Sequence, residues 1–397
     1  MNLNFMAAPV HGCYYLSTDC FYVEINIEGS TGRIAEAKVH HIDSNNHSNQ
    51  TSSSKNCPEI IECLTKGQFT KFVDHLEGLM AIYDLPNASA QDKTRGWNAL
   101  STLENDILRI DNQRCGFAES DIANKINHGG LGLVQPRAGG LPMKLTFFIP
   151  PKDQIDTASK TFRKLSPATI NEHHIGLSAT IGLEKIETPR PLPIHSLIMS
   201  DGKEVPLSQH NSVSLPARFV LELEQEMALE IGKLQDIINI TGIDFMPSGN
   251  ESLTPLFQLV SKQASNGILD SSNNRGLFVV SFSCFCDEKN AFFSLTYVVV
   301  KCDVKCNHVI LFFQTLPDQN HCYFLMDHES LQGYAVKKIP FAHPSNLIGI
   351  LAILRQQAAF NAIVTSCVRT TGVQGKFRNI THTVWKFYKT VFFSRLR

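Results

Sequence analysis

The chain has 397 residues, of which 43% are hydrophobic and 18% charged, a globular composition with room for one large or two ordinary domains. A formal net charge of −1 excludes a strong whole-chain field that would attract nucleic acid or anionic lipid. The N-terminus has neither a basic segment nor a long apolar run, so we expect the eleven cysteines to be reduced thiols in the cytosol or nucleus.

The first predicted elements are two paired strands. Apolar residues alternate over 20–28, which predicts a half-buried strand, and a glycine turn at 29–32 allows residues 33–42 to return as its partner. Residues 43–56 contain almost nothing that can be buried, so they predict a flexible loop. Residues 1–12 are predicted to be irregular.

Helical patterns follow, beginning at Pro58, because proline suits the first helical position. The second predicted helix carries one apolar stripe, formed by Phe69, Phe72, Val73, Leu76, Leu79 and Met80. Further helices are predicted over about 93–108, with Trp97, Leu100, Leu103 and Leu108 inward, and over about 119–127.

The rest of the chain predicts a mixture of strands and helices. Strands are predicted at 144–150, 177–184, 214–224, 322–326 and 333–341, with a proline-rich extended connector at 189–193. Helices are predicted at 226–240, 252–264 and 345–368, the last with Leu347, Ile350, Leu351, Leu354, Ala358 and Ile363 on one side. Because strands and helices are grouped, we predict an α+β fold: a large mixed domain with mainly antiparallel strands and several amphipathic helices.

The most apolar stretch, residues 276–300, is interrupted by charges and does not predict a membrane span. Asp287, Glu288 and Lys289 divide it, and neither half reaches the roughly 20 apolar residues that a spanning helix needs. We therefore assign no transmembrane segment and expect no membrane partner.

The glycine-rich segment 127–140, NHGGLGLVQPRAGG, raises the question of a phosphate-binding loop. A dinucleotide fingerprint needs a third glycine where Gln135 stands and a preceding strand where a helix is predicted. A structural role fits better: Gly129 after the helix C-terminus with a left-handed backbone, and Gly139-Gly140 as a turn before a strand.

Other candidate sites are incomplete. The segment 328–332, HESLQ, resembles a zinc-protease motif but has Gln332 where the second histidine must stand, and no G-x-S-x-G occurs. Four thiols that could bind zinc, Cys284, Cys286, Cys302 and Cys306, lie among Phe and Val with an uncommon spacing, which favours buried hydrophobic side chains. We assign no catalytic, cofactor-binding or metal-binding residue.

Histidine pairs and the C-terminal tail are weaker candidate sites. His40-His41 and His173-His174 are neighbours that point to opposite faces if they lie on strands, so they fit surface or packing roles. The tail from Lys376 mixes basic and aromatic residues without an acid, which suits phosphate contacts and base stacking, membrane contact, or simply a loosely packed end.

Several segments in shared order resemble the family of subunit 1 of the Mediator complex of RNA polymerase II transcription. They are CYYLSTDCFYVEI (13–25), CPEIIECL (57–64), FVDHLEGLMAIYDLP (72–86), HGGLGLVQPRAGG (128–140), PLPIHSLIM (191–199), SVSLPARF (212–219), TGID (241–244), HCYFLMDHESLQGYAVKKIPFAHP (321–344) and LRQQAAFNAIVTSCVR (354–369). The resemblance implies a nuclear, non-enzymatic coactivator without a cofactor. It also implies attachment to the middle module of Mediator, and L-x-x-L-L helices of the full-length family that bind activators such as nuclear receptors.

The chain departs from the family pattern in places, which suggests a domain division. We expect a first family part at 13–270, an apolar cysteine-rich insert at 271–313, a continued family part at 314–370 and a basic aromatic tail at 371–397. The family's usual N-terminal helices before residue 13 and its later strands are absent, and the nearest approach to L-x-x-L-L, residues 347–351, has Ile350 at the fourth position. We hypothesise that the insert and the tail after Gly372 are translated non-coding sequence, which spliced cDNA retaining both would rule out.

Three functions are consistent with the sequence. The first is a scaffold-type coactivator that links gene-specific activators to RNA polymerase II through Mediator subunits. The second is an enzyme whose site is assembled from distant residues, which a pocket lined by groups with shifted pKa values would favour. The third is a nucleic-acid binder acting through the basic tail, which steeply salt-dependent binding would favour.

Overall fold

The structure is a computed structural model of the chain. It describes residues 4–8, 12–42, 52–85, 88–113, 116, 121–156, 159, 161–246, 253–264, 277–280, 298–301, 308–316, 319–326 and 331–369. The side chains of residues 277–326 are not part of this description.

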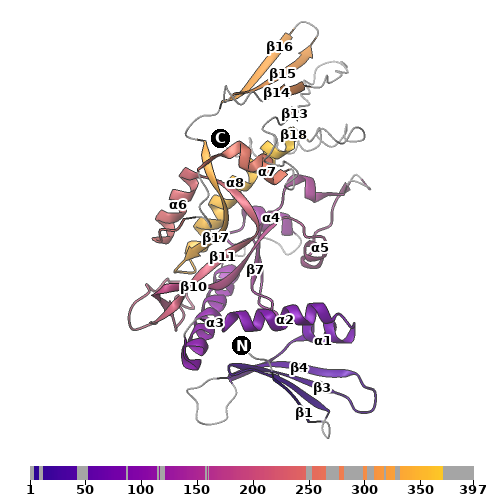
Figure 1. Cartoon of the computed structure of the whole chain (residues 1–397), viewed down its shortest axis with the longest axis vertical. Helices are drawn as coiled ribbons and strands as arrows, with labels where there is room; N and C mark the ends of the chain where they lie inside the picture. The colour runs from indigo at the N-terminus through magenta and orange to yellow at the C-terminus, as the bar shows by residue number, and fades with distance from the viewer. Residues whose placement is uncertain are drawn as a thin grey trace.

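The N-terminal part is a five-stranded antiparallel sheet with helices on one face (Figure 1). Its strands, in both chain and spatial order, are β1 (Asn4–Ala8), β2 (Cys13–Ser17), β3 (Phe21–Ile27), β4 (Ile34–His41) and β5 (Ser52–Asn56). The alternation in β3 buries Phe21, Val23 and Ile25, as predicted. Two predictions are wrong: β1 lies within the segment 1–12 that was expected to be irregular, and β5 lies within the loop expected at 43–56, because backbone pairing with β2 and β4 orders both.

Three helices follow the sheet: α1 (Pro58–Thr65), α2 (Phe69–Ile82) and α3 (Ala90–Gln113). The α2 helix buries His75, Leu76, Leu79 and Ile82. The predicted stripe of α2 is wrong at one edge, since Phe69 and Val73 are 66% and 46% exposed. The buried face of α2 is rotated toward His75 because the glycine turn at 138–141 packs against that side.

The second layer is a six-stranded antiparallel sheet in the order β12-β17-β11-β10-β7-β6. The strands are β6 (Leu133–Gln135), β7 (Lys144–Phe148), β10 (Leu177–Pro193), β11 (Ser212–Glu230), β12 (Thr254–Pro255) and β17 (Gln332–Phe341). Residues 189–193, predicted to be a connector, belong to β10, where 190–193 pair with 212–215 of β11. Residues 226–230, predicted to begin a helix, extend β11 because 227–230 pair with β17.

A small cluster of elements lies beside β7. It contains α4 (Ile122–His128), the short 3-10 helix η2 (Pro151–Gln154), the hairpin of β8 (Ile155–Asp156) and β9 (Thr161–Phe162), and α5 (Pro167–Glu172). Its own hydrophobic core is formed by Ile126, Leu133, Ile149, Ile170 and Ile175. The Asp121 and Ser166 side chains accept hydrogen bonds from the first turns of α4 and α5, which explains where these helices begin.

Three more helices cover the six-stranded sheet: α6 (Ile231–Thr241), α7 (Leu256–Ala264) and α8 (Asn346–Cys367). In α8, Leu347, Ile350, Leu351 and Leu354 are fully buried, as predicted, whereas Ile363 is 45% exposed and the prediction for it is wrong. The segment that most resembles L-x-x-L-L is thus part of the core. Within the described part of the chain, no helix is both long and apolar enough to cross a bilayer.

Near the C-terminus the backbone forms two further small sheets. The strands β13 (Leu277–Val280), β14 (Val298–Lys301) and β18 (Val368–Arg369) make an antiparallel three-stranded sheet, and β15 (His308–Leu316) pairs with β16 (Gln319–Met326). The predicted strand 322–326 lies in β16. The proposed insert at 271–313 contains β13, β14 and part of β15, and the remainder of it lies outside the described residues.

The architecture confirms the predicted α+β class. Helices and antiparallel strands are grouped in the chain, and one large hydrophobic core runs from the N-terminal sheet through α3 to α8.

Candidate functional site

The α3 helix connects the two layers and carries two buried carboxylates. Its apolar face buries Leu100, Leu103 and Ile107. Glu104 is only 7% exposed and Asp106 only 1%, which is unusual for charged side chains. Each carboxylate joins α3 to a segment distant in sequence. These two groups of polar contacts are the chain's candidate functional site.

The first junction, called here the Trp97 junction, consists of His41, Tyr83, Trp97, Glu104 and Arg137. Arg137 binds Glu104 through three contacts: Nε to Oε1 at 2.9 Å, Nε to Oε2 at 3.2 Å and Nη2 to Oε1 at 2.7 Å. Both side chains are only 9% exposed. This geometry is the bidentate pairing that a planar guanidinium favours, and it ties the glycine-rich segment to α3.

Aromatic rings extend the Trp97 junction to the N-terminal sheet. The Arg137 guanidinium carbon lies 5.9 Å from the centroid of the Trp97 ring, and Trp97 stacks on His41 of β4 at 3.9 Å. His41 Nδ1 and the Tyr83 hydroxyl, at the end of α2, form a hydrogen bond. Five side chains therefore fasten β4, α2, α3 and the glycine-rich segment to one another.

Burial shifts the pKa values of two members of the Trp97 junction. Burial lowers the pKa of His41 to about 4, and the nearby Arg137 charge acts in the same direction. Burial also raises the pKa of the Tyr83 hydroxyl well above its usual range. Both residues are therefore neutral at pH 7.

We expect acid to weaken the protein through His41. Its pKa rises from about 4 in the folded state to about 6.5 when unfolded, so between these values the unfolded chain binds more protons. The contribution of His41 to the free energy of unfolding is fully present above pH 6.5. It is lost as pH falls toward 4, by up to about 3 kcal/mol. Denaturant titrations at pH 7.5 and 4.5 measure the loss, and His41→Gln should reduce it. An identical pH dependence in the variant would contradict this assignment.

The glycine-rich segment is a packing turn in which backbones approach closely. Gly139 has φ of 57°, and a Cβ on Gly140 would lie 1.7 Å from the His75 carbonyl oxygen. The Gly140 N–H donates to His75 Nδ1 at 3.3 Å. The predicted turn at 139–140 is confirmed. The prediction for Gly129 is wrong: its backbone is extended, with φ of −69° and ψ of 154°, and its Cβ would instead meet the Lys125 carbonyl oxygen at 2.3 Å.

Gly140→Ala should destabilise the fold because the added methyl group meets backbone rather than a movable side chain. We expect a loss of about 1–3 kcal/mol or more, measured by chemical unfolding. Gly29→Ala is the matched control, since nothing lies within 4 Å of its Cβ position. Equal stabilities of the two variants would contradict the close approach of α2 and the turn.

Arg355 of α8 holds the other end of the glycine-rich segment. Its guanidinium donates to the carbonyl oxygens of Phe147 at 2.8 Å, Ile126 at 3.1 Å and Gly130 at 3.3 Å. Burial lowers the pKa of Arg355 to about 10. The contact with Ile126 places a cation near the C-terminus of α4, where the helix dipole favours positive charge.

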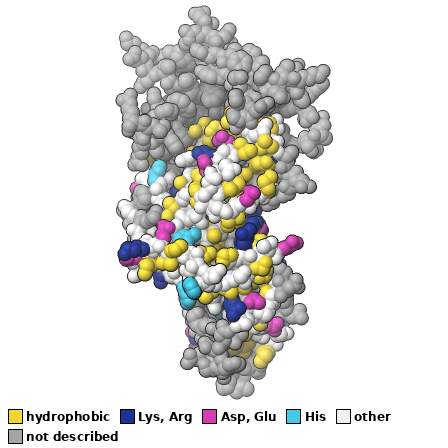
Figure 2. Space-filling view, turned by 90° about the vertical axis from the view of Figure 1, so that its left-hand side faces the viewer, with side chains coloured by type: hydrophobic (Ala, Val, Ile, Leu, Met, Phe, Trp, Pro, Cys, Tyr) yellow, Lys and Arg dark blue, Asp and Glu magenta, His cyan; other side chains and the backbone are white. Residues whose placement is uncertain are grey.

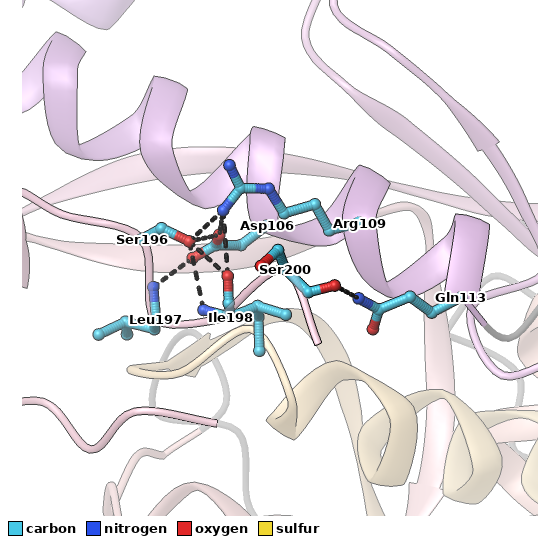
Figure 3. Close-up of polar contacts among 7 residues, drawn as sticks. All are labelled: Asp106, Arg109, Gln113, Ser196, Leu197, Ile198 and Ser200. Carbon is cyan, nitrogen blue, oxygen red and sulfur yellow. Dashed lines mark hydrogen bonds and ion pairs between the residues drawn. The ribbon is translucent and has the colours of Figure 1, made fainter. Parts of the chain in front are cut away.

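The second junction, called here the α3 clamp, fixes the loop that follows β10 (Figure 3). Asp106 Oδ2 accepts from the Leu197 backbone N–H at 2.7 Å, and Asp106 Oδ1 accepts from the Ser196 hydroxyl. Arg109 contacts Ser196 and donates to the Ile198 carbonyl oxygen at 3.0 Å, and Gln113 donates to the Ser200 carbonyl oxygen at 3.5 Å. Spacings of three and four residues place Asp106, Arg109 and Gln113 on one face of α3.

Of the candidate site residues considered in the sequence, the structure describes the two histidine pairs. His40 and His41 are buried on opposite faces of the N-terminal sheet, where His40 stacks on Tyr22 at 4.4 Å, and His173 and His174 are exposed. Cys284, Cys286, Cys302, Cys306, the segment 328–330 and the tail from Lys376 lie outside the described residues or side chains. Among the described residues, no three His, Cys, Asp or Glu side chains are grouped as metal ligands.

Neither the Trp97 junction nor the α3 clamp was predicted from the sequence patterns. One signal was present: Glu104 stands one helical turn after Leu100 and next to Leu103, on the stripe predicted to face inward. A charge in such a stripe predicts a buried partner of opposite charge. The partner, Arg137, lies 33 residues away and could not be chosen without the fold.

These features define a class of protein: a large mixed α+β domain whose buried charges join its layers. The family model of Mediator of RNA polymerase II transcription subunit 1 matches residues 13–369, and the chain belongs to this family. The matched range includes the proposed insert, whose status stays a prediction.

Curated relatives with the name Mediator of RNA polymerase II transcription subunit 1 agree with the family match. The relative from Xenopus laevis is 30% identical over 371 residues, and the one from Drosophila melanogaster is 31% identical over 385 residues. These alignments cover 90% and 93% of this chain but 21% and 22% of the relatives. The chain thus spans about a fifth of the length of the relatives it matches.

Proposed function

We propose that the chain acts in the nucleus as a coactivator subunit of the Mediator complex, as a protein–protein scaffold without catalytic activity or a cofactor. The observation that carries the proposal is the family match over residues 13–369. The proposed partners are other Mediator subunits of the middle module. Linkage of gene-specific activators to RNA polymerase II is part of the same proposal.

The proposal places no nuclear-receptor contact on residues 347–351. Leu347, Ile350 and Leu351 are fully buried in α8, so a receptor groove could reach them only if the helix left the core. Activators of that kind would bind elsewhere in a full-length family member.

Exposed apolar side chains support a role in protein contacts. Hydrophobic side chains gather on the side of the molecule that carries α6 (Figure 2). Ile231 and Ile240 of α6 are 40% and 37% exposed. Protein interfaces commonly have an apolar centre surrounded by a rim of polar groups.

Affinity purification of the tagged chain from nuclease-treated nuclear extract, followed by mass spectrometry, tests the proposal. We expect Mediator subunits, foremost those of the middle module, to be recovered in excess over a tag-only control. Recovery that disappears with nuclease treatment would favour the nucleic-acid binder. A folded chain that recovers no Mediator subunit would contradict the proposal.

A further inference from the structure

The apolar face of the N-terminal sheet extends beyond the helices that cover it. At the centre of the sheet, Phe21 and Val23 of β3 are fully buried. On β2, Tyr14 and Leu16 are half-buried, and on β1 Phe5 is 65% exposed although it pairs with Leu16 on the same face. The helical layer therefore ends before the apolar surface does.

The outermost strand also presents a bare backbone edge. The β1 strand pairs along all five residues with β2, and it is the terminal strand of the sheet, so one side of its backbone has no strand partner among the described residues. Its sequence, NFMAA, contains no charge and no proline. Met6, on the opposite face from Phe5, is 63% exposed.

The exposed edges of the six-stranded sheet carry protective features that β1 lacks. The outer part of β10, beyond its pairing with β7, contains Pro189 and Pro191, exposed charges and a shift of register. At the ends of the six-stranded sheet, β6 has three residues and β12 has two, including Pro255. Prolines, charges, irregularities and short length are the means by which proteins prevent edge pairing. The β1 strand has no proline and no charge, so nothing in its sequence prevents another strand from pairing with its edge.

We propose that β1 is a docking edge for an extended segment of another polypeptide of the Mediator complex. This inference rests on the proposed function and names one of its contact surfaces. Free backbone N–H and C=O groups along an edge are satisfied by a strand, so the partner segment adds a sixth strand to the sheet. Phe5 and Met6 are exposed on opposite faces of the sheet, so the added strand would cover an apolar side chain on each face. We therefore expect the partner segment to have about five residues, without charge or proline.

A second copy of this chain is a poorer occupant of the edge than a segment of a different subunit. Self-pairing through five residues would bury far less than the roughly 800 Å² per partner of a stable interface. A strand donated by a neighbouring subunit needs no such area of its own, since other contacts within the assembly hold that subunit in place.

Hydrogen exchange on the tagged full chain, free and purified within Mediator, tests the proposal. We expect backbone amides of residues 4–8 to exchange at least about tenfold more slowly in the complex. Met6→Lys places a charge at the edge and should abolish this protection. Met246→Lys is the matched control, because Met246 is similarly exposed at 72%, and this variant should retain the protection. A photo-crosslinking phenylalanine analogue at position 5 should attach to a charge-free segment of another subunit.

Each alternative outcome has a distinct meaning. Entry into the complex with unchanged exchange at residues 4–8, or equal effects of the two lysine variants, would overturn the docking edge alone. Protection that grows with concentration of the isolated chain would overturn it in favour of self-pairing. Failure of the folded wild-type chain to enter the complex would overturn both this inference and the proposed function.

Discussion

Glu104→Ala is expected to lower the free energy of unfolding by about 3–5 kcal/mol, because removing one partner of a buried ion pair leaves an uncompensated charge. The Arg137 side chain, which is 9% exposed, would then lack the carboxylate that accepts its hydrogen bonds. The destabilisation should be visible as a lower denaturation midpoint with an unchanged slope. Trp97 should report it by fluorescence, since its ring packs beside Arg137.

A double-mutant cycle separates the pair from the rest of the Trp97 junction. Replacing Glu104 by Gln and Arg137 by Met, singly and together, should give a double variant that is more stable than the sum of the single losses indicates. The control is the more solvent-accessible pair of Asp92 and Arg95, 3.3 Å apart with side chains 35% and 41% exposed, where removal should cost less than about 1 kcal/mol. Additive losses at Glu104 and Arg137 would contradict the buried pair.

Asp106→Ala is expected to lower the free energy of unfolding by about 3–6 kcal/mol, since two hydrogen bonds to a charged acceptor contribute roughly 1.5–3 kcal/mol each. The Leu197 N–H and the Ser196 hydroxyl would lose their common acceptor in a site where Asp106 is 1% exposed. The loop after β10 should then become mobile, with faster amide exchange at Leu197 and earlier proteolysis of the loop.

Asp106→Asn serves as the conservative partner of this variant. Its amide keeps one acceptor oxygen and the side-chain shape, so we expect a loss of roughly half that of the alanine variant, by the same unfolding measurement. A neutral effect of Asp106→Ala, with unchanged exchange at Leu197, would show that the α3 clamp does not hold the loop.

The pattern of apolar residues along the sequence predicted an element correctly where that element packs against the core. The β3 strand was predicted correctly because burial of Phe21, Val23 and Ile25 reproduces its alternation. The α8 helix was predicted within a residue or two, since its apolar residues cover most of its circumference.

The sequence pattern gave a wrong prediction where pairing or packing between distant segments determines the secondary structure or the buried face. Residues 226–230 contain good helix formers, yet pairing of 227–230 with β17 keeps them in β11. Phe69 and Val73 fit a helical stripe, but the approach of Gly140 rotates the buried face of α2. Glu104 and Arg137 lie in segments whose contact depends on the whole fold, so the Trp97 junction could not be derived from periodicity.

We propose that this chain works through contact with other Mediator subunits. Gradient sedimentation of nuclear extract that contains the tagged, full-length chain tests it most directly. We predict that the chain sediments with Mediator subunits at the position of the large complex. Sedimentation of the folded chain as an isolated monomer, away from every Mediator subunit, would contradict the claim.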